Sequence, residues 1–470
     1  MPNTDSDPPR VDVTAVAPSQ DADSSEQGSI LKAFLLTVQH VFGGFQRLFQ
    51  GVTDPRHPAY VTYPLPTLMA TGVLMFLLRL GARRQVSNLL RGNGPSAAKY
   101  QILFGVESCP HGDTLNYAYA RCASAEVQEV VSAMTDTLIR RKLLYRHRLL
   151  DQYFLVVVDG TGMLSFSERH CPSCMTRTYQ GDTFYYHPVL EAKLVTPTGF
   201  VFSLMTEFIE NPRANPSKQD CELKAFYRLA ERLKQRFPRL PICLLLDGLF
   251  AGGPTLSICE QYHWKYLIVL QEDDLPFVNE EFELLSQLPP ETHLVFRTGV
   301  QLEIRQDLRW VNHIAYLDSQ QKEHTVAVIE CLETKPDADR RLRTTRFKWI
   351  TNFNVTASKV VALANQGGRL RWKIENEGFN VQKNGGYALE HVFSQDATAG
   401  KVFYLLLQIA HLLSQLIEHG SLFRKAFPNG VGSAKNIAFR LLEAWRNLRL
   451  SLTDVQQLLD TRIQIRFAPP

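Results

Sequence analysis

The sequence predicts an α/β protein whose mixed β-sheet is flanked by helical regions at both ends of the chain. Three observations support this fold class. Apolar residues recur with helical spacing up to about residue 148, short apolar runs typical of buried strands begin at Phe154, and helical spacing returns near Ser358. The 470 residues are enough for several domains, and a hydrophobic content of 45% excludes global disorder.

Residues 1–28 hold six acidic residues and one basic residue, so we expect them to form a disordered acidic tail. Residues 29–150 are predicted to be helical. Their most apolar stretch, Leu65 to Leu80, is interrupted by Pro66 and Arg79 and is shorter than a membrane span needs, which predicts a buried helix and no membrane association. The eight cysteines are too sparse for a disulfide scaffold, so we expect reduced thiols.

Residues 151–290 are predicted to contain strands that first pair antiparallel and then alternate with helices. Phe154–Val158 and Ile242–Leu246 are continuous apolar runs, as expected of strands buried on both faces. Residues 197–199 (Pro-Thr-Gly) predict a tight turn between two further strands. The remaining predicted elements of this region are strands at Tyr185–Val195, Phe200–Phe208 and Tyr266–Leu270 and helices at Cys221–Phe237 and Thr255–Tyr262.

Residues 291–355 resemble a β-rich insertion with little helix. Helical spacing resumes in residues 356–425 and continues in a C-terminal helical region, residues 426–470. Val402–His419 is almost entirely apolar, which predicts a buried helix. The strands expected in the insertion are His293–Arg297, Gln301–Arg305, Asn312–Leu317, Thr325–Leu332 and Arg346–Phe353.

Two aspartates stand in matching positions. Asp159 follows the apolar run 154–158 and precedes Gly160, and Asp247 follows the run 242–246 and precedes Gly248. Open α/β sheets bind ligands at the carboxyl ends of their strands, and a glycine permits a sharp turn and close approach of a ligand. Two carboxylates brought together repel each other, and a divalent metal between them would relieve the repulsion. An ordinary Asp-Gly turn is the alternative for each.

A third acid is offered by residues 371–380 (Arg-Trp-Lys-Ile-Glu-Asn-Glu-Gly-Phe-Asn). On a helix Arg371 and Glu375 share a face because they are four residues apart. Glu375 and Glu377 are about 200° apart, so only one of them can face a metal, and the sequence leaves open which one. An exposed helix with internal ion pairs is the alternative explanation.

With these residues in view, the chain resembles the DDE transposases of bacterial insertion sequences, in the branch with a Tyr-x2-Arg-x3-Glu-x6-Lys signature. The resemblance covers about residues 150–420 and implies a ribonuclease-H-like core with a β-rich insertion before the glutamate helix. Arg371 and Glu375 have the signature's spacing. Gly368 stands at the tyrosine position and Gln382 at the lysine position, with Lys383 one residue later.

The resemblance implies that Asp159, Asp247 and Glu375 are catalytic and hold magnesium or manganese. Two divalent metals serve the two ends of an in-line phosphodiester displacement, and carboxylates are hard ligands suited to them. Arg371 would bind a DNA phosphate through its planar guanidinium, and Lys383 is a second phosphate-binding candidate.

The implied function is metal-dependent DNA strand cleavage and strand transfer of an insertion sequence. The partners would be double-stranded DNA, as terminal inverted repeats and as target, with residues 29–150 as the DNA-binding domain, a homodimer on DNA, and a cytoplasmic, nucleoid-associated location. The alternatives are a catalytically inactive or domesticated DNA-binding derivative, a ribonuclease-H-like nuclease that does not rejoin ends, and a metal-independent carboxylate-pair hydrolase acting on sugars.

A second group of chemically active residues is His170-Cys171-Pro172-Ser173-Cys174, with His187 downstream. A Cys-x-x-Cys pair with nearby histidines is a zinc-ligand pattern, but no second pair follows. Structural zinc held by Cys171, Cys174 and one of the two histidines, reduced structural thiols, and redox chemistry all remain open.

Overall fold

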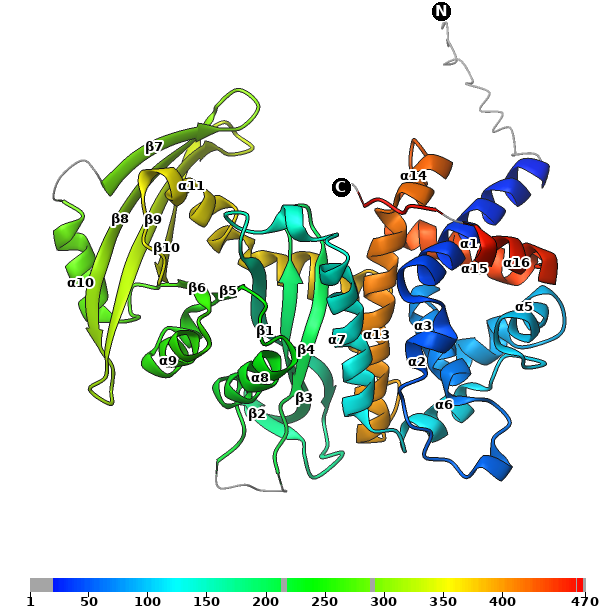
Figure 1. The fold of residues 1–470 in the computed structure, drawn as a ribbon. Helices are drawn as coiled ribbons and strands as arrows, with labels where there is room; N and C mark the ends of the chain where they lie inside the picture. The colour runs from blue at the N-terminus through cyan, green and yellow to red at the C-terminus, as the bar shows by residue number, and fades with distance from the viewer. Residues whose placement is uncertain (1–19, 213–217, 288–291, 462, 468–470) are drawn as a thin grey trace, which may run out of the picture.

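The computed structural model describes residues 20–212, 218–287, 292–461 and 463–467 (Figure 1). It is a mixed α/β structure in which ten strands form one sheet with helices on both sides. The strand order is β2-β3-β1-β5-β6-β10-β9-β8-β7, and β4 pairs with β3 next to β2. The strands are β1 (Phe154–Phe166), β2 (Met175–Tyr179), β3 (Asp182–Val195), β4 (Val201–Phe208), β5 (Ile242–Leu246), β6 (Lys265–Val269), β7 (His293–Thr298), β8 (Ile304–Leu317), β9 (Glu323–Pro336) and β10 (Leu342–Thr351).

Strand directions divide the sheet into two parts. β1, β3 and β4 are antiparallel neighbours, whereas β5 and β6 run parallel to β1. β10 pairs antiparallel with β6, so β7–β10 extend the same sheet instead of forming a separate one. Figure 1 shows this extension as long curved strands reaching away from the helical side of the molecule.

Helices precede, interrupt and follow the sheet. Those before it are α1 (Gln20–Phe42), α2 (Phe45–Phe49), α3 (Leu65–Leu77), α4 (Arg83–Gln85), α5 (Pro95–Phe104), α6 (Gly112–Tyr119) and α7 (Ser124–Arg140), with short turns η1 (Pro58–Tyr60), η2 (Val86–Leu90) and η3 (Tyr145–His147). Those within and after it are α8 (Glu222–Arg236), η4 (Gly248–Phe250), α9 (Gly253–Tyr262), α10 (Pro276–Leu285), α11 (Ala357–Asn365), η6 (Gly368–Trp372), η7 (Ile374–Phe379), α12 (Asn380–Asn384), α13 (Ala397–Glu418), α14 (Ser421–Ala426), α15 (Ala434–Asn447) and α16 (Leu452–Asp460).

Strand β1 is buried on both faces, as its apolar run predicts. Val156 and Val158 belong to a large core that includes α3, α7, α8 and α13. Leu155 and Val157 point the other way, into a second core formed with α11, Ile374 and Phe379. Because side chains alternate along a strand, each face of the central sheet has its own apolar cover.

α13 is the central helix of the molecule. It lies beside α7, between the sheet and the other N-terminal helices (Figure 1). In the described residues it is the helix that is long and apolar enough to cross a membrane, but 89% of its most apolar window is buried inside the protein. The prediction of a buried helix at Val402–His419 is therefore confirmed, as is the buried helix predicted from Leu65, observed as α3.

Three predictions about local structure are wrong. The disordered tail predicted for residues 1–28 is wrong from Gln20 onward, because α1 begins at that residue. Residues 1–19 lie outside the described residues. Helix α1 packs against α15, and Glu26 pairs with Arg440, which stabilises a segment whose composition alone favours disorder. Gln301–Arg305 and Asn312–Leu317 do not form two strands: only Ile304 and Arg305 of the first are in a strand, and they belong with the second to one strand, β8, which has an irregularity between Val311 and Ile314.

The third wrong prediction concerns Asp159, which does not end its strand. β1 continues through Gly160 to Phe166 because β3 pairs with it along this whole length, so there is no turn at Gly160. Only the parallel pairing of β1 with β5 stops at Val157. Asp247, in contrast, directly follows the last residue of β5, as expected.

A polar network is buried between the sheet and α13. Lys193 and Glu191 of β3 are both fully buried, with Nζ 3.6 Å from a carboxylate oxygen. Lys193 also donates to Gln408 of α13, which accepts a further hydrogen bond from Gln382. Burial lowers the pKa of Lys193, and the neighbouring Glu191 opposes this shift. Each charge is tolerated because the other is present.

We predict that Lys193→Met lowers the free energy of unfolding by about 3–5 kcal/mol, because it leaves Glu191 buried and unpaired. Lys335 is the matched control: its Nζ is also 3.6 Å from a glutamate, Glu333, but its side chain is 49% exposed. Lys335→Met should cost less than about 1 kcal/mol. Denaturant unfolding measures both, and equal losses would contradict the assignment of the buried pair.

Candidate carboxylate site

The parallel pairing of β1 with β5 brings Asp159 and Asp247 together. Val157 is paired with Leu245, and two residues later along the chain come Asp159, which is within β1, and Asp247, which directly follows β5. The two aspartates therefore have equivalent positions. Because side chains alternate along a strand, both point to the face of the sheet that the second core covers. Their charges interact, since Asp247 raises the pKa of Asp159.

The turns η6 and η7 cover the same face and supply the third acid and a cation. η6 contacts β5, and η7 contacts β1. Arg371 Nη1 lies 3.3 Å from Asp159 Oδ2, and only 11% of the Arg371 side chain is exposed. The charge of Glu375 raises the pKa of Asp159, which indicates that Glu375 lies near Asp159. Charge interactions thus link Asp159 both to Asp247 and to Glu375.

Glu377, the rival of Glu375, is engaged elsewhere. One of its carboxylate oxygens lies 2.7 Å from Lys373 Nζ. No interaction of Glu377 with Asp159 or Asp247 is found among the described residues. The geometry therefore favours Glu375 as the third acid of the cluster.

A fourth carboxylate, Glu222, joins the cluster and was missed by sequence reasoning. It is the first residue of α8, and its pKa is raised by burial and by the charges of Asp159 and Asp247. A Cβ placed on Gly160 would lie 2.2 Å from Glu222 Oε1. Gly160 is therefore required for the close approach of Glu222, and not for a turn. No strand ends at Glu222, so the rule that found the aspartates does not reach it.

Asp274 is a fifth acid at the edge of the cluster. A Cβ on Gly248 would lie 2.4 Å from Asp274 Oδ2, and Asp274 raises the pKa of Asp247. It comes five residues after the last residue of β6, whereas Asp247 directly follows β5. The rule that found the aspartates therefore does not reach Asp274.

The cluster carries more negative charge than its cation balances. Burial is the largest cause that raises the pKa values of Asp159 and Asp247, and Arg371 lowers both only in part. Two or more carboxylates held together in this way fit a divalent cation, because hard oxygen ligands are those that magnesium and manganese prefer. Asp159, Asp247, Glu375 and Glu222 have the oxygen ligands for such an ion, but among the described residues their ligand atoms are not gathered within 4.8 Å of one another as those of His170, Cys171, Cys174 and His187 are.

A π-helix can explain why Lys383 comes one residue later than the Glu-x6-Lys spacing of the signature. Residues 374–379 form the π-helix η7, which closes i→i+5 bonds and accommodates one extra residue per turn. Seven residues beyond Glu375, Gln382 is fully buried and hydrogen-bonded to Gln408. Lys383 comes one residue after Gln382, in α12. Its partner in the described residues is Glu390, with Nζ 3.5 Å from Oε1, and no direct contact joins it to the acids.

Gly368 also has a structural reason. A Cβ at this position would lie 2.5 Å from the indole ring of Trp349 on β10. The insertion therefore fills the space that a tyrosine at position 368 would need. Trp349 is itself buried, whereas Trp372, beside Arg371, is 56% exposed.

A cavity of about 440 Å³ adjoins the carboxylates. It is lined by Asp247, Arg369, Arg371 and Trp372, and on its far wall by Arg346 and Lys348 of β10. Arg346 and Lys348 are both paired with Glu283, which partly neutralises that wall. The arginines of η6 are paired as well, Arg369 with Glu333 and Arg371 with Asp159, so each of these cations already has an acidic partner.

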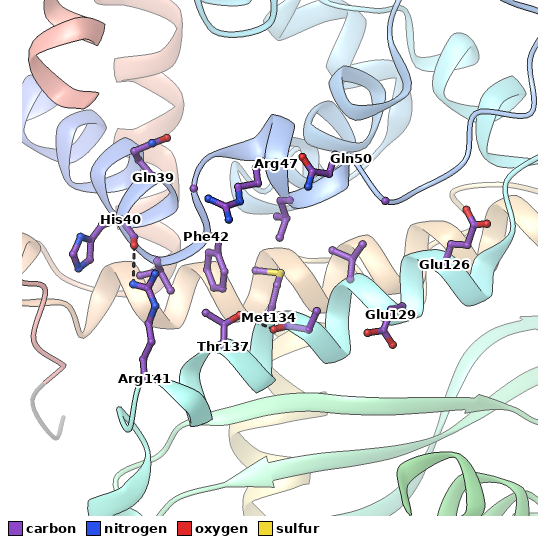
Figure 2. A pocket seen from close by; sticks show the side chains of 16 residues that line it. Gln39, His40, Phe42, Arg47, Gln50, Glu126, Glu129, Met134, Thr137 and Arg141 are labelled. Carbon is purple, nitrogen blue, oxygen red and sulfur yellow. Dashed lines mark hydrogen bonds between the residues drawn. The ribbon is translucent and has the colours of Figure 1, made fainter. Parts of the chain in front are cut away.

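A larger cavity, about 690 Å³, lies between α1–α2 and α7. None of these acids lines it. Figure 2 shows Arg47 and Arg141 on one side and Glu126 and Glu129 on the other. The acids already have partners: Glu129 binds Arg236, and Glu126 accepts hydrogen bonds from Thr53. The cavity is lined by none of the site residues that the sequence predicts, and size alone does not make it the candidate site.

The histidine and cysteine residues form a separate cluster. Ligand atoms of His170, Cys171, Cys174 and His187 all lie within 4.8 Å of one another. The two Sγ atoms are 3.5 Å apart, and His187 Nε2 lies 3.4 Å from Cys171 Sγ and 3.3 Å from Cys174 Sγ. The structure brings both histidines to the cysteines, where the sequence left open which one approaches.

Comparison with known proteins gives no family. No protein-family model matches the sequence. A search of curated proteins finds no similar sequence.

We predict that Asp159→Asn raises the Tm at pH 7 in buffer free of magnesium and manganese. The pKa of the Asp159 carboxyl is raised in the folded state, so the protein loses stability as the pH rises from the unfolded-state pKa, near 3.8, through the folded-state pKa. The asparagine amide does not ionise and avoids this loss. The gain should vanish near pH 3, where the carboxyl is protonated in both states. Thermal unfolding across this pH range measures it.

Asp54→Asn is the control of opposite sign. Its hydrogen bond with Arg56 lowers the pKa of Asp54, so the carboxylate stabilises the fold above its unfolded pKa and loses this effect as pH falls. The Asp54 variant should have a lower Tm at pH 7. A lower Tm for both variants would contradict the repulsion inferred at Asp159.

Proposed function

We propose that the protein is a DDE transposase that cleaves DNA strands and joins them to a target with the help of divalent metal ions. The observation that carries this proposal is the convergence of Asp159, Asp247 and Glu375 at one edge of a sheet. These residues are far apart in sequence, and the side chains that the resemblance assigns to catalysis are the ones brought together.

The fold supports the same proposal. The central strands follow the order β4-β3-β1-β5-β6, with the first three antiparallel and the last two parallel to β1. This is the arrangement that a ribonuclease-H-like core would have, with Asp159 within β1 just beyond its pairing with β5 and Asp247 directly after β5. Strands β7–β10 stand where the resemblance predicts an insertion, between β6 and the turn that carries Glu375.

The side chains have distinct tasks in this proposal. Asp159, Asp247, Glu375 and Glu222 would hold two divalent ions, which when bound supply activation of the attacking hydroxyl and stabilisation of the leaving oxygen. Arg371 binds a DNA phosphate through its fork of N–H groups, and its position against Asp159 keeps that phosphate next to the carboxylates. Lys383 extends the phosphate contact along the same helix face.

The partner is double-stranded DNA, first as the terminal inverted repeats of the element and then as target. The exposed arginines Arg340, Arg341 and Arg343 at the β9–β10 turn have no acidic ion-pair partner among the described residues, unlike Arg346, and suit contact with the phosphate backbone. The helical region from α1 to α7 is the proposed DNA-binding domain. Two ends must be handled together, which favours a homodimer on DNA at a cytoplasmic, nucleoid-associated location.

A second candidate function is a derivative that binds DNA without catalysis. The departures at Gly368 and Gln382 favour it. The structural reasons for both, the indole of Trp349 and the π-helix η7, weaken this alternative because they leave Asp159, Asp247 and Glu375 together.

The test is strand cleavage and joining by the purified protein, with DNA that carries the sequences flanking its own gene and a supercoiled plasmid as target. We predict that both reactions need magnesium or manganese. Glu375→Gln should lower the rate about 100-fold or more, since a metal supplies several kcal/mol of charge stabilisation. Gel analysis of nicked and joined products measures both steps.

Glu377→Gln is the matched control, because it makes the same change two residues away on the same turn. It should retain most of the activity. DNA binding, measured by gel shift, should survive in both variants. Activity that persists in the presence of a magnesium chelator, or that is lost equally in the two variants, would contradict the proposal. Cleavage without joining would instead support the nuclease alternative.

A further inference from the structure

We propose that His170, Cys171, Cys174 and His187 form a structural zinc site. These residues lie outside the carboxylate cluster: three are in the connection between β1 and β2, and His187 is on β3 opposite Leu164. A zinc ion would join this connection to the centre of the sheet.

The distances between the ligand atoms fit a tetrahedral zinc ion. Zinc bonds of about 2.3 Å to sulfur and 2.0–2.1 Å to nitrogen give a tetrahedron with S···S near 3.8 Å and S···N near 3.6 Å. The observed values are 3.5 Å between the two Sγ atoms and 3.4 and 3.3 Å from them to His187 Nε2. A disulfide, in contrast, requires about 2.05 Å between the sulfur atoms.

The backbone and the packing hold the four side chains in place. Cys174 N–H donates to Cys171 O over 3.3 Å, which closes the turn between the two cysteines. His170 stacks on Phe166, with ring centroids 4.5 Å apart and planes at 4°. Its Nδ1 is buried and has no hydrogen-bond partner, a cost that coordination to a metal would remove.

Charge balance favours zinc at a buried position. Binding of Zn²⁺ by two cysteine thiols and two neutral imidazoles forms two Zn–S and two Zn–N bonds and releases the two thiol protons to solvent. The resulting centre has no net charge. It can therefore be tolerated at a place where Cys174 is fully buried and His187 is 6% exposed.

The site is structural and not catalytic because four protein ligands complete the coordination of zinc. Its position gives it a task. Cys174 O accepts from Asn211 Nδ2 over 2.9 Å, and Ser173 O accepts from Asn211 N–H over 3.1 Å. The Asn211 side chain in turn contacts Gln219 and accepts from Asp220 N–H, next to the start of α8. Zinc would thereby fix the chain that leads to Glu222.

Metal analysis of the full-length protein, purified under reducing conditions with zinc supplied, tests the proposal. We expect one zinc ion per chain in the wild type and its loss in Cys171→Ser and Cys174→Ser. Cys221→Ser is the matched control, because Cys221 is exposed and lies outside the cluster. It should keep its zinc.

Cobalt substitution of the wild-type protein keeps the test valid if a variant fails to fold. Tetrahedral cobalt(II) with two thiolates gives intense visible absorption and a sulfur-to-metal charge-transfer band, and we expect both. A wild-type protein without zinc, a disulfide between Cys171 and Cys174, or zinc retained in both serine variants would overturn the proposal.

Hydrogen exchange tests the structural task. Removal of zinc should speed amide exchange at Cys174, Asn211 and Asp220 and leave α13 unchanged. Unchanged exchange at all these amides would overturn the link to Glu222. The zinc content does not depend on the proposed function, so a failure of DNA cleavage and a failure of zinc binding are separate results.

Discussion

The burial of neighbouring carboxylates near β1 and β5 is the constraint on which the rest of the structure depends. Burial raises the pKa values of Asp159, Asp247 and Glu222, repulsion between the acids adds to this, and Arg371 contacts Asp159 as a cation. Such a cluster destabilises the fold in the absence of further cations. The surrounding structure must therefore hold these acids in place, and the packing of two buried cores on opposite faces of the sheet does so.

The glycines at this edge show how closely the parts are fitted. Gly160 leaves room for Glu222, Gly248 leaves room for Asp274, and Gly368 leaves room for Trp349. Each glycine permits the close approach of an element from another part of the chain. The insertion thus takes part in the site, since its last strand carries the indole that determines where η6 lies.

Sequence reasoning could predict those features that depend on local pattern. The apolar runs predicted that Asp159 and Asp247 follow buried strands of one sheet, and the structure shows that these strands are parallel neighbours. It could not choose between Glu375 and Glu377, since a π-helix leaves no mark on α-helical spacing. Glu222 was missed because its approach depends on the path of the chain between β4 and α8. The extension of β1 beyond Asp159 was missed because it depends on pairing with β3.

The most direct test of the account is a crystal structure of the full-length protein with manganese, analysed by anomalous diffraction. The account predicts two manganese ions roughly 3.5–4 Å apart, with oxygen ligands from Asp159, Asp247 and Glu375. Manganese absent from these carboxylates at saturating concentration, or bound without Glu375, would contradict it.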